Sequence, residues 1–334
     1  MTKILVLSPA YLRYEDLVCN AFRSKGYDVA WFENTSVIRD RVDCAPPAYQ
    51  ATIKLVKRLY RFMTGERRWF LLFFLDPLAI LHSWCGAWKL LRQLPYDATV
   101  ALVIRGDMQP AWFYRALRRR VPGIELVNFQ YDDLSRLCRP PEFWRHMFDR
   151  VYTYNYLDAS EEGFIYAPMP FFGKARDTIE RRDIDILFVG STHSKRDMLI
   201  KALVDRYPKV SICYYLLGNS KVDGLTTQSA PLPYEEYLNL LRRSRCVLDI
   251  PAIGQTGLTT RAYESLATKT KVITTNTHAR RYPLFEYGNI SILEEETLDL
   301  DMSFVFSAYN ELPESVVGEY SLEHWISTLI GTHV

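Results

Sequence analysis

Short apolar runs alternate with amphipathic segments along the chain, and this alternation predicts repeated strand–helix–strand units. Residues 3–9 (KILVLSP) are typical of a buried strand. Residues 14–26 carry apolar side chains at helical spacing and end in Gly26, a residue suited to closing a helix. Residues 27–33 (YDVAWFE) predict a second strand. Units of this kind build a parallel sheet that helices cover on both faces.

The first half continues after a long helical and apolar region at residues 48–94. Within it, residues 69–91 are long enough to span a membrane, but Asp76, Pro77 and His82 interrupt them. We therefore expect a buried helix pair that breaks at Asp76-Pro77. The segments that follow predict three strands, at residues 97–106, 124–133 and 149–155, with a helix at residues 110–123.

A second series of strand–helix units follows residues 161–183, a segment rich in proline, glycine and charge where we place a domain boundary. This series predicts strands, some with their loops, at 184–192, 210–219, 246–254, 271–276 and 289–293, and helices at 195–208, 233–244, 259–268 and 321–331. The predicted fold class is α/β with two Rossmann-like domains. We expect an N-terminal domain at residues 1–165, a C-terminal domain at 180–315, and a helix within 316–334 that packs back toward the N-terminal domain.

Composition narrows the classes of function. The chain has 334 residues, 48% apolar and 24% charged, which fits two ordinary globular domains. The net charge of +2 argues against a nucleic-acid partner, because such proteins carry a strong basic excess. The six cysteines include no C-x-x-C pair, which excludes the usual zinc spacings and favours reduced thiols in a cytoplasmic protein.

Candidate chemistry gathers in the stretch GQTGLTTRAYESLATKTKVITTN, residues 254–276. Its loop follows a predicted strand, and ligands of parallel sheets bind beyond the carboxyl ends of strands. Thr259, Thr260 and Arg261 open the next helix, whose N-terminal N–H groups are suited to phosphate. Glu264 lies about one turn further on, where a carboxylate can accept hydrogen bonds from ribose hydroxyls. The alternative is that Glu264 is an ordinary solvated helix residue.

A second loop, VGSTHSKR at residues 189–196, has the same character. Its small residues allow a ligand to approach the backbone, and its basic residues can neutralise a diphosphate; they are Gly190, Ser191, His193, Lys195 and Arg196. The alternative is a solvated helix face with a structural histidine. Together the two loops predict a nucleotide diphosphate site in one α/β domain. The chain has no Walker-A and no G-x-G-x-x-G pattern, which disfavours an NTPase or a dinucleotide dehydrogenase.

These motifs, in the order DILFVGS, CVLDIPAIGQTGLTTRAYESLATKTKVITTN and YPLFEYGNISIL, resemble the C-terminal nucleotide-sugar domain of GT-B glycosyltransferases. The resemblance covers about residues 145–295 and is strongest to the bacterial branch for capsule, exopolysaccharide or lipopolysaccharide synthesis. It implies two domains that face each other across a cleft, with a nucleotide-sugar donor and a glycan or lipid-linked acceptor. We expect no cofactor and no metal. Cationic side chains and helix N-termini would then stabilise the departing phosphate.

The resemblance also implies roles for individual residues. Glu264 corresponds to the ribose-binding carboxylate, and Thr260 and Arg261 lie where the family's helix start meets the diphosphate. Many retaining members carry a second glutamate eight positions earlier, where this chain has Thr256. Gln255 or Thr256, next to Gly257, is therefore expected to contact the sugar, and the anomeric outcome stays open.

The N-terminal domain should then supply the acceptor contacts. Candidates follow its predicted strands: Ser8, Tyr11, Arg105 and Tyr131 as acceptor contacts, and Asp107 and Asp132 as general bases. The alternative for the aspartates is ordinary turn and N-cap chemistry.

A basic segment at residues 54–70 mixes lysine and arginine with aromatic side chains, and it suits peripheral contact with an anionic membrane at the inner face of the cell membrane. A solvated helix face is the alternative for this segment. Two further functions fit the same architecture: a non-catalytic nucleotide-binding assembly protein and a sugar-nucleotide epimerase.

Overall fold

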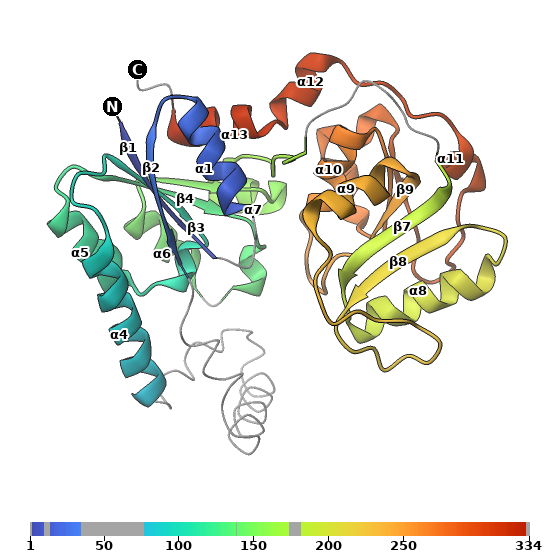
Figure 1. Ribbon diagram of the computed structural model, residues 1–334, viewed down its shortest axis with the longest axis horizontal. Helices are drawn as coiled ribbons and strands as arrows, with labels where there is room; N and C mark the ends of the chain where they lie inside the picture. The colour runs from blue at the N-terminus through green and yellow to red at the C-terminus, as the bar shows by residue number, and fades with distance from the viewer. Residues whose placement is uncertain (1, 10–13, 35–76, 138, 174–181, 332–334) are drawn as a thin grey trace. The chain divides into compact units, whose positions relative to one another are not determined.

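The computed structural model describes residues 2–9, 14–34, 77–137, 139–173 and 182–331, without the side chains of residues 77–83. The chain forms two compact units (Figure 1). The first unit contains Met1–Pro168 and Trp325–Val334, and the second contains Met169–His324. Each unit is built around one parallel sheet, so the predicted α/β class with two Rossmann-like domains is confirmed.

The first unit has a sheet of six parallel strands in the order β2-β1-β3-β4-β5-β6. Its strands are β1 (Lys3–Ser8), β2 (Asp28–Glu33), β3 (Val100–Ile104), β4 (Glu125–Gln130), β5 (Arg150–Thr153) and β6 (Ile165–Tyr166). Its helices are α1 (Glu15–Ser24), α4 (Pro77–Gln93), α5 (Ala111–Arg120), α6 (Pro141–Met147) and α7 (Tyr156–Glu162).

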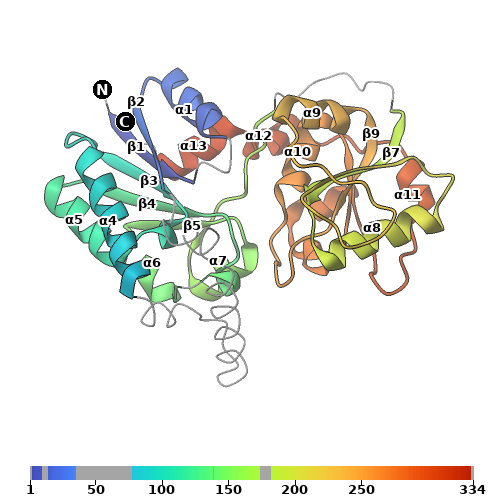
Figure 2. The same ribbon diagram turned by 60° about the horizontal axis from the view of Figure 1, so that its bottom comes forward.

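Helices cover both faces of this sheet, as Figures 1 and 2 show. Alternate residues of each strand point to opposite faces. Leu5 and Leu7 accordingly join a core with Tyr114 of α5 and Trp144 of α6. The opposite face carries α1 and α13 (Leu322–Ile330), the last helix of the chain.

The helix α13 begins within the range of the second unit and continues into the first. There the Trp325 ring lies edge-on to Phe129 of β4, with 4.9 Å between ring centroids. The Arg150 side chain donates to the Ile330 carbonyl at 3.1 Å, and the Tyr152 hydroxyl donates to the Thr328 carbonyl at 2.9 Å. The last turns of the chain therefore complete the covering of the first sheet.

The second unit has a sheet of five parallel strands in the order β11-β10-β9-β7-β8. Its strands are β7 (Ile184–Ser191), β8 (Ile212–Leu217), β9 (Ser244–Asp249), β10 (Lys271–Thr274) and β11 (Ile290–Ile292). Its helices are α8 (Ser194–Arg206), α9 (Tyr234–Arg242), α10 (Thr260–Thr268), α11 (Met302–Phe306) and α12 (Glu314–Glu319). Residues from α8 and α11 pack on one face, and α9 and α10 contact each other on the opposite face (Figure 1).

One expectation about burial is wrong. The first helix of the expected pair, before Pro77, lies outside the described residues. The second is α4, which begins at Pro77 but is not buried all round. Trp84 and Trp88 are 50% and 56% exposed, because only one side of the helix packs on the sheet. Among the described residues, none of the helices is both long and apolar enough to cross a bilayer.

Candidate functional site

The connections of the second sheet change direction between β7 and β9. The two strands are hydrogen-bonded neighbours, but the chain leaves β7 toward β8 and leaves β9 toward β10, on opposite sides. Ligands of open parallel sheets bind beyond the carboxyl ends of the strands at such a point. Both loops predicted from the sequence follow these two strands, so the fold brings them to one edge.

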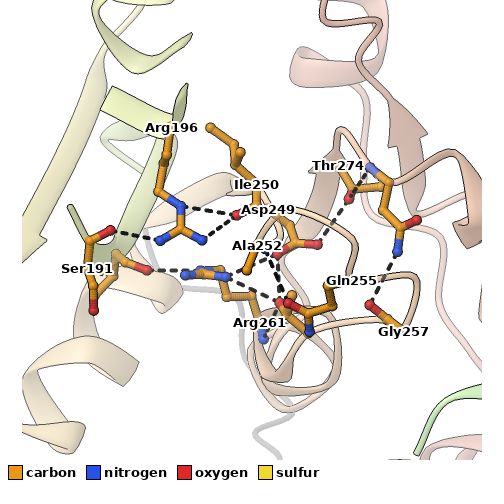
Figure 3. Close-up of polar contacts among 12 residues, drawn as sticks. Ser191, Arg196, Asp249, Ile250, Ala252, Gln255, Gly257, Arg261 and Thr274 are labelled. Atoms are coloured by element: carbon orange, nitrogen blue, oxygen red, sulfur yellow. Dashed lines mark hydrogen bonds and ion pairs between the residues drawn. The ribbon is translucent and has the colours of Figure 1, made fainter. Parts of the chain in front are cut away.

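Asp249, the last residue of β9, organises this edge (Figure 3). Its side chain is fully buried and accepts three hydrogen bonds. Thr259 Oγ1 donates at 2.6 Å, Arg261 Nη1 at 3.1 Å and Thr274 Oγ1 at 3.0 Å. One buried carboxylate thus fixes the first turn of α10 and the end of β10, and its charge is compensated by the Arg261 guanidinium.

Arg261 lies across the ends of the two central strands, and its side chain is 14% exposed. Besides its bond to Asp249, its Nε donates to the Val189 carbonyl at 2.9 Å. Its Nη2 donates to none of the residues that the structure describes, so two N–H groups remain for a ligand. A Cβ at Gly190 would lie 2.7 Å from Nη2, so only glycine leaves room for the guanidinium there.

Arg196, from the first turn of α8, ties the same two strand ends together. Its Nη1 donates to the Ser191 carbonyl at 2.7 Å, and its Nη2 donates to the Ile250 carbonyl at 2.7 Å. The guanidinium carbons of Arg196 and Arg261 lie 5.5 and 5.1 Å from the ring centroid of buried Phe188. Two cations are therefore held rigidly at one sheet edge, an arrangement suited to a diphosphate.

The other two basic residues of the α8 loop are placed differently. His193 is the N-cap of α8, and its backbone N–H donates to Asp197 Oδ1 at 3.1 Å. Lys195 Nζ lies 2.5 Å from Glu295 Oε2, in an ion pair whose lysine side chain is 48% exposed. Exposed pairs of this kind are weak, and a ligand can compete for the lysine. A phosphate contact by His193 or Lys195 stays a prediction.

The glycine-containing loop before α10 is held by Asn276, which follows β10. Asn276 Nδ2 donates to the carbonyls of Thr256 and Gly257, at 2.9 and 3.2 Å. Gln255 Oε1 accepts from the Ala252 N–H at 3.2 Å. The Thr-Thr-Asn end of the predicted stretch therefore serves the site: Thr274 anchors Asp249, and Asn276 anchors the loop.

Glu264 lies in the middle of α10 and is fully buried. Its Oε1 accepts from the Tyr234 hydroxyl at 2.7 Å and from the Phe172 N–H at 3.1 Å. Its Oε2 is buried without a hydrogen-bond partner among the described residues. Burial raises the pKa of Glu264 to about 7, and the hydrogen bond from Tyr234 opposes that rise. The ribose contact of Glu264 stays a prediction, and Oε2 is the atom left to make it.

In the first unit, Arg105 follows β3 at the corresponding sheet edge. Its Nε and Nη2 donate to the two carboxylate oxygens of Asp107, both at 2.8 Å, and its Nη1 donates to Asp132. Arg136 Nη1 lies 3.5 Å from the other oxygen of Asp132. The structure thus gathers both predicted bases around one guanidinium, and the Tyr131 ring centroid lies 5.8 Å from Arg105 Cζ.

The Arg105 backbone adopts a left-handed conformation, with φ of 61° and ψ of 67°. Non-glycine residues hold such angles only where the surroundings fix them. Asn34 Nδ2 donates to the Arg105 carbonyl at 3.2 Å, and the next N–H, of Gly106, donates to Asn128 Oδ1 at 2.9 Å. Ser8 Oγ, at the end of neighbouring β1, accepts from Trp31 Nε1 at 2.7 Å. Tyr11 lies outside the described residues.

Solved structures with a similar fold are glycosyltransferases. The glycosyltransferase VinC in complex with dTDP is 9% identical, with 99% of this chain and 98% of that chain covered and a TM-score of 0.52. An alpha,alpha-trehalose-phosphate synthase (UDP-forming) from Burkholderia xenovorans, in complex with glucose-6-phosphate, is 11% identical, with 99% of each chain covered and a TM-score of 0.60. The chain has the GT-B fold. No protein-family model and no curated protein matches its sequence.

In several glycosyltransferases a D-x-D triplet binds a metal ion, and this chain contains two such triplets, at Asp183/Asp185 and Asp299/Asp301. Asp183 directly precedes β7 and Asp185 is its second residue, at the end of the strand opposite Gly190 and Ser191. The two aspartates pair with Arg243 and Arg245. Asp301 caps α11, and Asp299 pairs with Arg206. Within the described ranges, no three His, Cys, Asp or Glu side chains gather as metal ligands.

The sequence analysis missed Asp249, Thr274, Asn276 and Asn34 as site residues. All four are buried polar side chains at or just after the carboxyl end of a strand. The signal was present, because all four residues lie within or directly after predicted strand segments, and the carboxyl ends of strands form ligand sites in this fold class.

Proposed function

We propose that this protein is a glycosyltransferase that moves a sugar from a nucleotide-sugar donor to a surface-glycan or lipid-linked acceptor. The Arg261 guanidinium carries the proposal. It is held by Asp249 and the Val189 carbonyl where the second sheet changes direction, and its Nη2 is left for a ligand. The solved structures that share the fold include a complex with dTDP and a UDP-forming synthase, which supports a nucleotide diphosphate as the leaving group.

The proposed donor site uses two helix N-termini and two arginines. The diphosphate lies beside Gly190, against the first turn of α10 at Thr259 and Thr260, where backbone N–H groups and Arg261 receive its charge. Glu264 accepts hydrogen bonds from the ribose hydroxyls through Oε2. No metal ion is needed in this scheme, because these groups stabilise the charge that develops on the departing phosphate.

The proposed reaction joins the acceptor hydroxyl oxygen to the anomeric carbon. The bond from that carbon to the diphosphate oxygen breaks, the nucleoside diphosphate leaves, and the hydroxyl proton passes to a carboxylate of the first unit. Asp132 is better suited than Asp107 to take the proton. Its side chain is 24% exposed, accepts one hydrogen bond from Arg105 and has the partly exposed Arg136 3.5 Å from its other oxygen, whereas Asp107 is 9% exposed and bound by Arg105 through both oxygens. Membrane contact through residues 54–70 lies outside the described residues and stays a prediction.

A thermal-shift panel of UDP-, GDP-, CMP-, ADP- and dTDP-sugars tests the donor site, because a ligand that binds the native state raises its melting temperature. We expect one base to stand out and the shift to vanish in Arg261→Ala. Arg243→Ala is the matched control, since Arg243 is 48% exposed and pairs with Asp183 away from the site. A full shift in Arg261→Ala contradicts the proposed site.

Turnover separates this function from the two alternatives. Release of nucleoside diphosphate that requires an acceptor supports the transferase. Binding without any turnover identifies a non-catalytic nucleotide-binding protein, and conversion of the donor sugar with no acceptor present identifies an epimerase.

A further inference from the structure

The outer side of α4 and α5 in the first unit carries a cluster of exposed tryptophans. Trp84 and Trp88 are one helical turn apart on α4, and both indoles pack against Trp112 of α5, with ring centroids 5.7 and 6.2 Å apart. Trp84 is 50% exposed and Trp88 is 56% exposed. Contiguous apolar surface of this kind on a globular protein marks an interaction site.

The charged residues on the described parts of α4 and α5 are all basic. Residues 84–93 and 111–120 contain six lysines and arginines and no aspartate or glutamate. Two of them serve the fold: Arg118 lies 3.0 Å from Asp149, and Arg120 donates to the Arg92 carbonyl at 3.2 Å while stacking on Tyr96. The other four are exposed and form no ion pair with any described residue; they are Lys89, Arg92, Arg115 and Arg119.

We propose that the α4–α5 face, made of Trp84, Trp88, Trp112, Lys89, Arg92, Arg115 and Arg119, docks on an anionic lipid membrane. Indole rings favour the boundary between lipid headgroups and acyl chains, where an apolar ring and a polar N–H are both accommodated. Basic side chains beside such rings are attracted by the negative surface, each adding about fivefold to the affinity. The proposal goes beyond glycosyl transfer and does not depend on it.

The geometry favours a membrane over a nucleic acid. Proteins that bind single strands present aromatic ring faces on which successive bases stack. Here the indoles of Trp84 and Trp88 pack against Trp112, so they form one compact apolar cluster rather than separate stacking platforms. The positive charge is also local, since the whole chain carries a net charge of only +2.

Co-sedimentation of the full-length protein with vesicles tests the proposal. We expect binding to vesicles that mix phosphatidylglycerol with phosphatidylcholine, weaker binding in high salt, and little binding to phosphatidylcholine alone. The double variant Arg115→Gln/Arg119→Gln removes two of the four unpaired cations, so its affinity falls about 30-fold at low salt. Trp84→Ser/Trp88→Ser loses binding even in low salt, because the insertion of the rings is lost.

Matched controls come from the second unit. Met198 and Phe306 are 57% and 52% exposed, so Met198→Ser/Phe306→Ser removes similar apolar surface away from the proposed face. Arg206→Gln/Arg243→Gln removes two cations that already pair with aspartates. Both controls are expected to bind as the unaltered protein does. Melting temperatures and near-UV circular dichroism verify that every variant is folded.

Three outcomes overturn the proposal. Equal binding to anionic and neutral vesicles shows that the basic residues do not attract the protein to the membrane. Unchanged vesicle binding in both α4–α5 variants shows that this face is not the membrane-binding surface. Tight binding of a labelled oligonucleotide that is lost in the same variants and displaces vesicles assigns the face to nucleic acid instead.

Discussion

Asp249 at the end of β9 and Arg105 after β3 occupy corresponding places in two sheets with the same strand order around the central pair. At the second sheet a buried carboxylate is the centre, and hydroxyl and guanidinium donors surround it. At the first sheet a guanidinium is the centre, and two carboxylates surround it. The same topology therefore presents outward N–H donors in one unit and carboxylate oxygens in the other.

This inversion explains which ligand chemistry each edge can accept. The donors around Asp249 suit an anion such as a diphosphate, because the central carboxylate already balances one of the two arginines. The oxygens around Arg105 suit hydroxyl groups, which need acceptors for their protons. The two centres also differ in burial: the Asp249 side chain is fully buried, whereas that of Arg105 is 12% exposed.

If Asp132, at the carboxyl edge of the first sheet, takes the proton of the acceptor hydroxyl, Asp132→Asn lowers turnover by about 10²–10⁴-fold. Its affinity for the donor nucleotide should stay unchanged, since the proposed donor site lies in the second unit. Initial rates and calorimetric titration measure the two quantities. Asp97→Asn is the control, because Asp97 is 70% exposed and pairs with Lys3. If turnover of Asp132→Asn stays within twofold of that of the unaltered protein, Asp132 is not the proton acceptor.

Asp249→Asn breaks the centre of the second edge. The free energy of unfolding should fall by about 3–5 kcal/mol, because the variant leaves the Arg261 guanidinium without its carboxylate. Nucleotide affinity should fall with it. Urea unfolding measures the first effect, and Asp183→Asn, in an exposed pair with Arg243, should change stability by less than about 0.5 kcal/mol. Equal losses in the two variants would show that Asp249 is not the organising group.

Glu264 gives the second unit a pH dependence. Its pKa is about 7 in the folded protein against an ordinary 4.5, so between these values the unfolded chain has released a proton that the folded protein keeps. Stability therefore decreases as pH rises from 4.5 to 7, by about 3 kcal/mol, and levels off above that. Glu264→Gln should remove this decrease and be the more stable protein at pH 8.

Unfolding free energies measured from pH 4 to pH 8 provide the check. In Glu264→Gln the free energy of unfolding should still decrease somewhat over this pH range. Burial raises the pKa of Asp158, in the first unit, from 3.8 to about 7, so this residue adds a pH dependence of its own. A slope in Glu264→Gln as steep as that of the unaltered protein would refute the assignment to Glu264.

The smallest effect concerns the backbone of Arg105. Both Arg105→Ala and Arg105→Gly remove the charge, but glycine adopts the left-handed conformation without a steric penalty. Arg105→Gly should therefore be more stable than Arg105→Ala by about 1 kcal/mol. Chemical denaturation of the two variants measures the difference. The reverse order would mean that the left-handed conformation is not kept in the variants.

The sequence predicted the fold better than the contacts within the site. Strand–helix alternation placed all the major parallel strands, because a period of two or of 3.6 is a local property. The short β6 (Ile165–Tyr166) was missed, since two residues carry no such period. Helix α4 was expected to be buried because its long apolar run is interrupted and does not suit a membrane span, whereas Trp84 and Trp88 face outward.

Long-range pairing set the limit for the site. Arg105 and Asp107 are neighbours in the sequence, but nothing local shows that Asp132, 27 residues away, binds the same guanidinium. In the same way, nothing in the local sequence shows that Thr259 and Thr274 both donate hydrogen bonds to Asp249. The loops could be assigned to one edge from topology, and the hydrogen bonds within the edge could not.

The last helix makes the first unit discontinuous along the chain. During synthesis, residues 1–168 emerge first, but the turns that cover Phe129 emerge only after the whole second unit. On the ribosome, α1 therefore covers only part of that face of the N-terminal sheet, and the packing of α13 is a late step in folding. Deleting residues from α13, or fusing a bulky tag to the C-terminus, would thus be expected to destabilise the N-terminal unit before the C-terminal one.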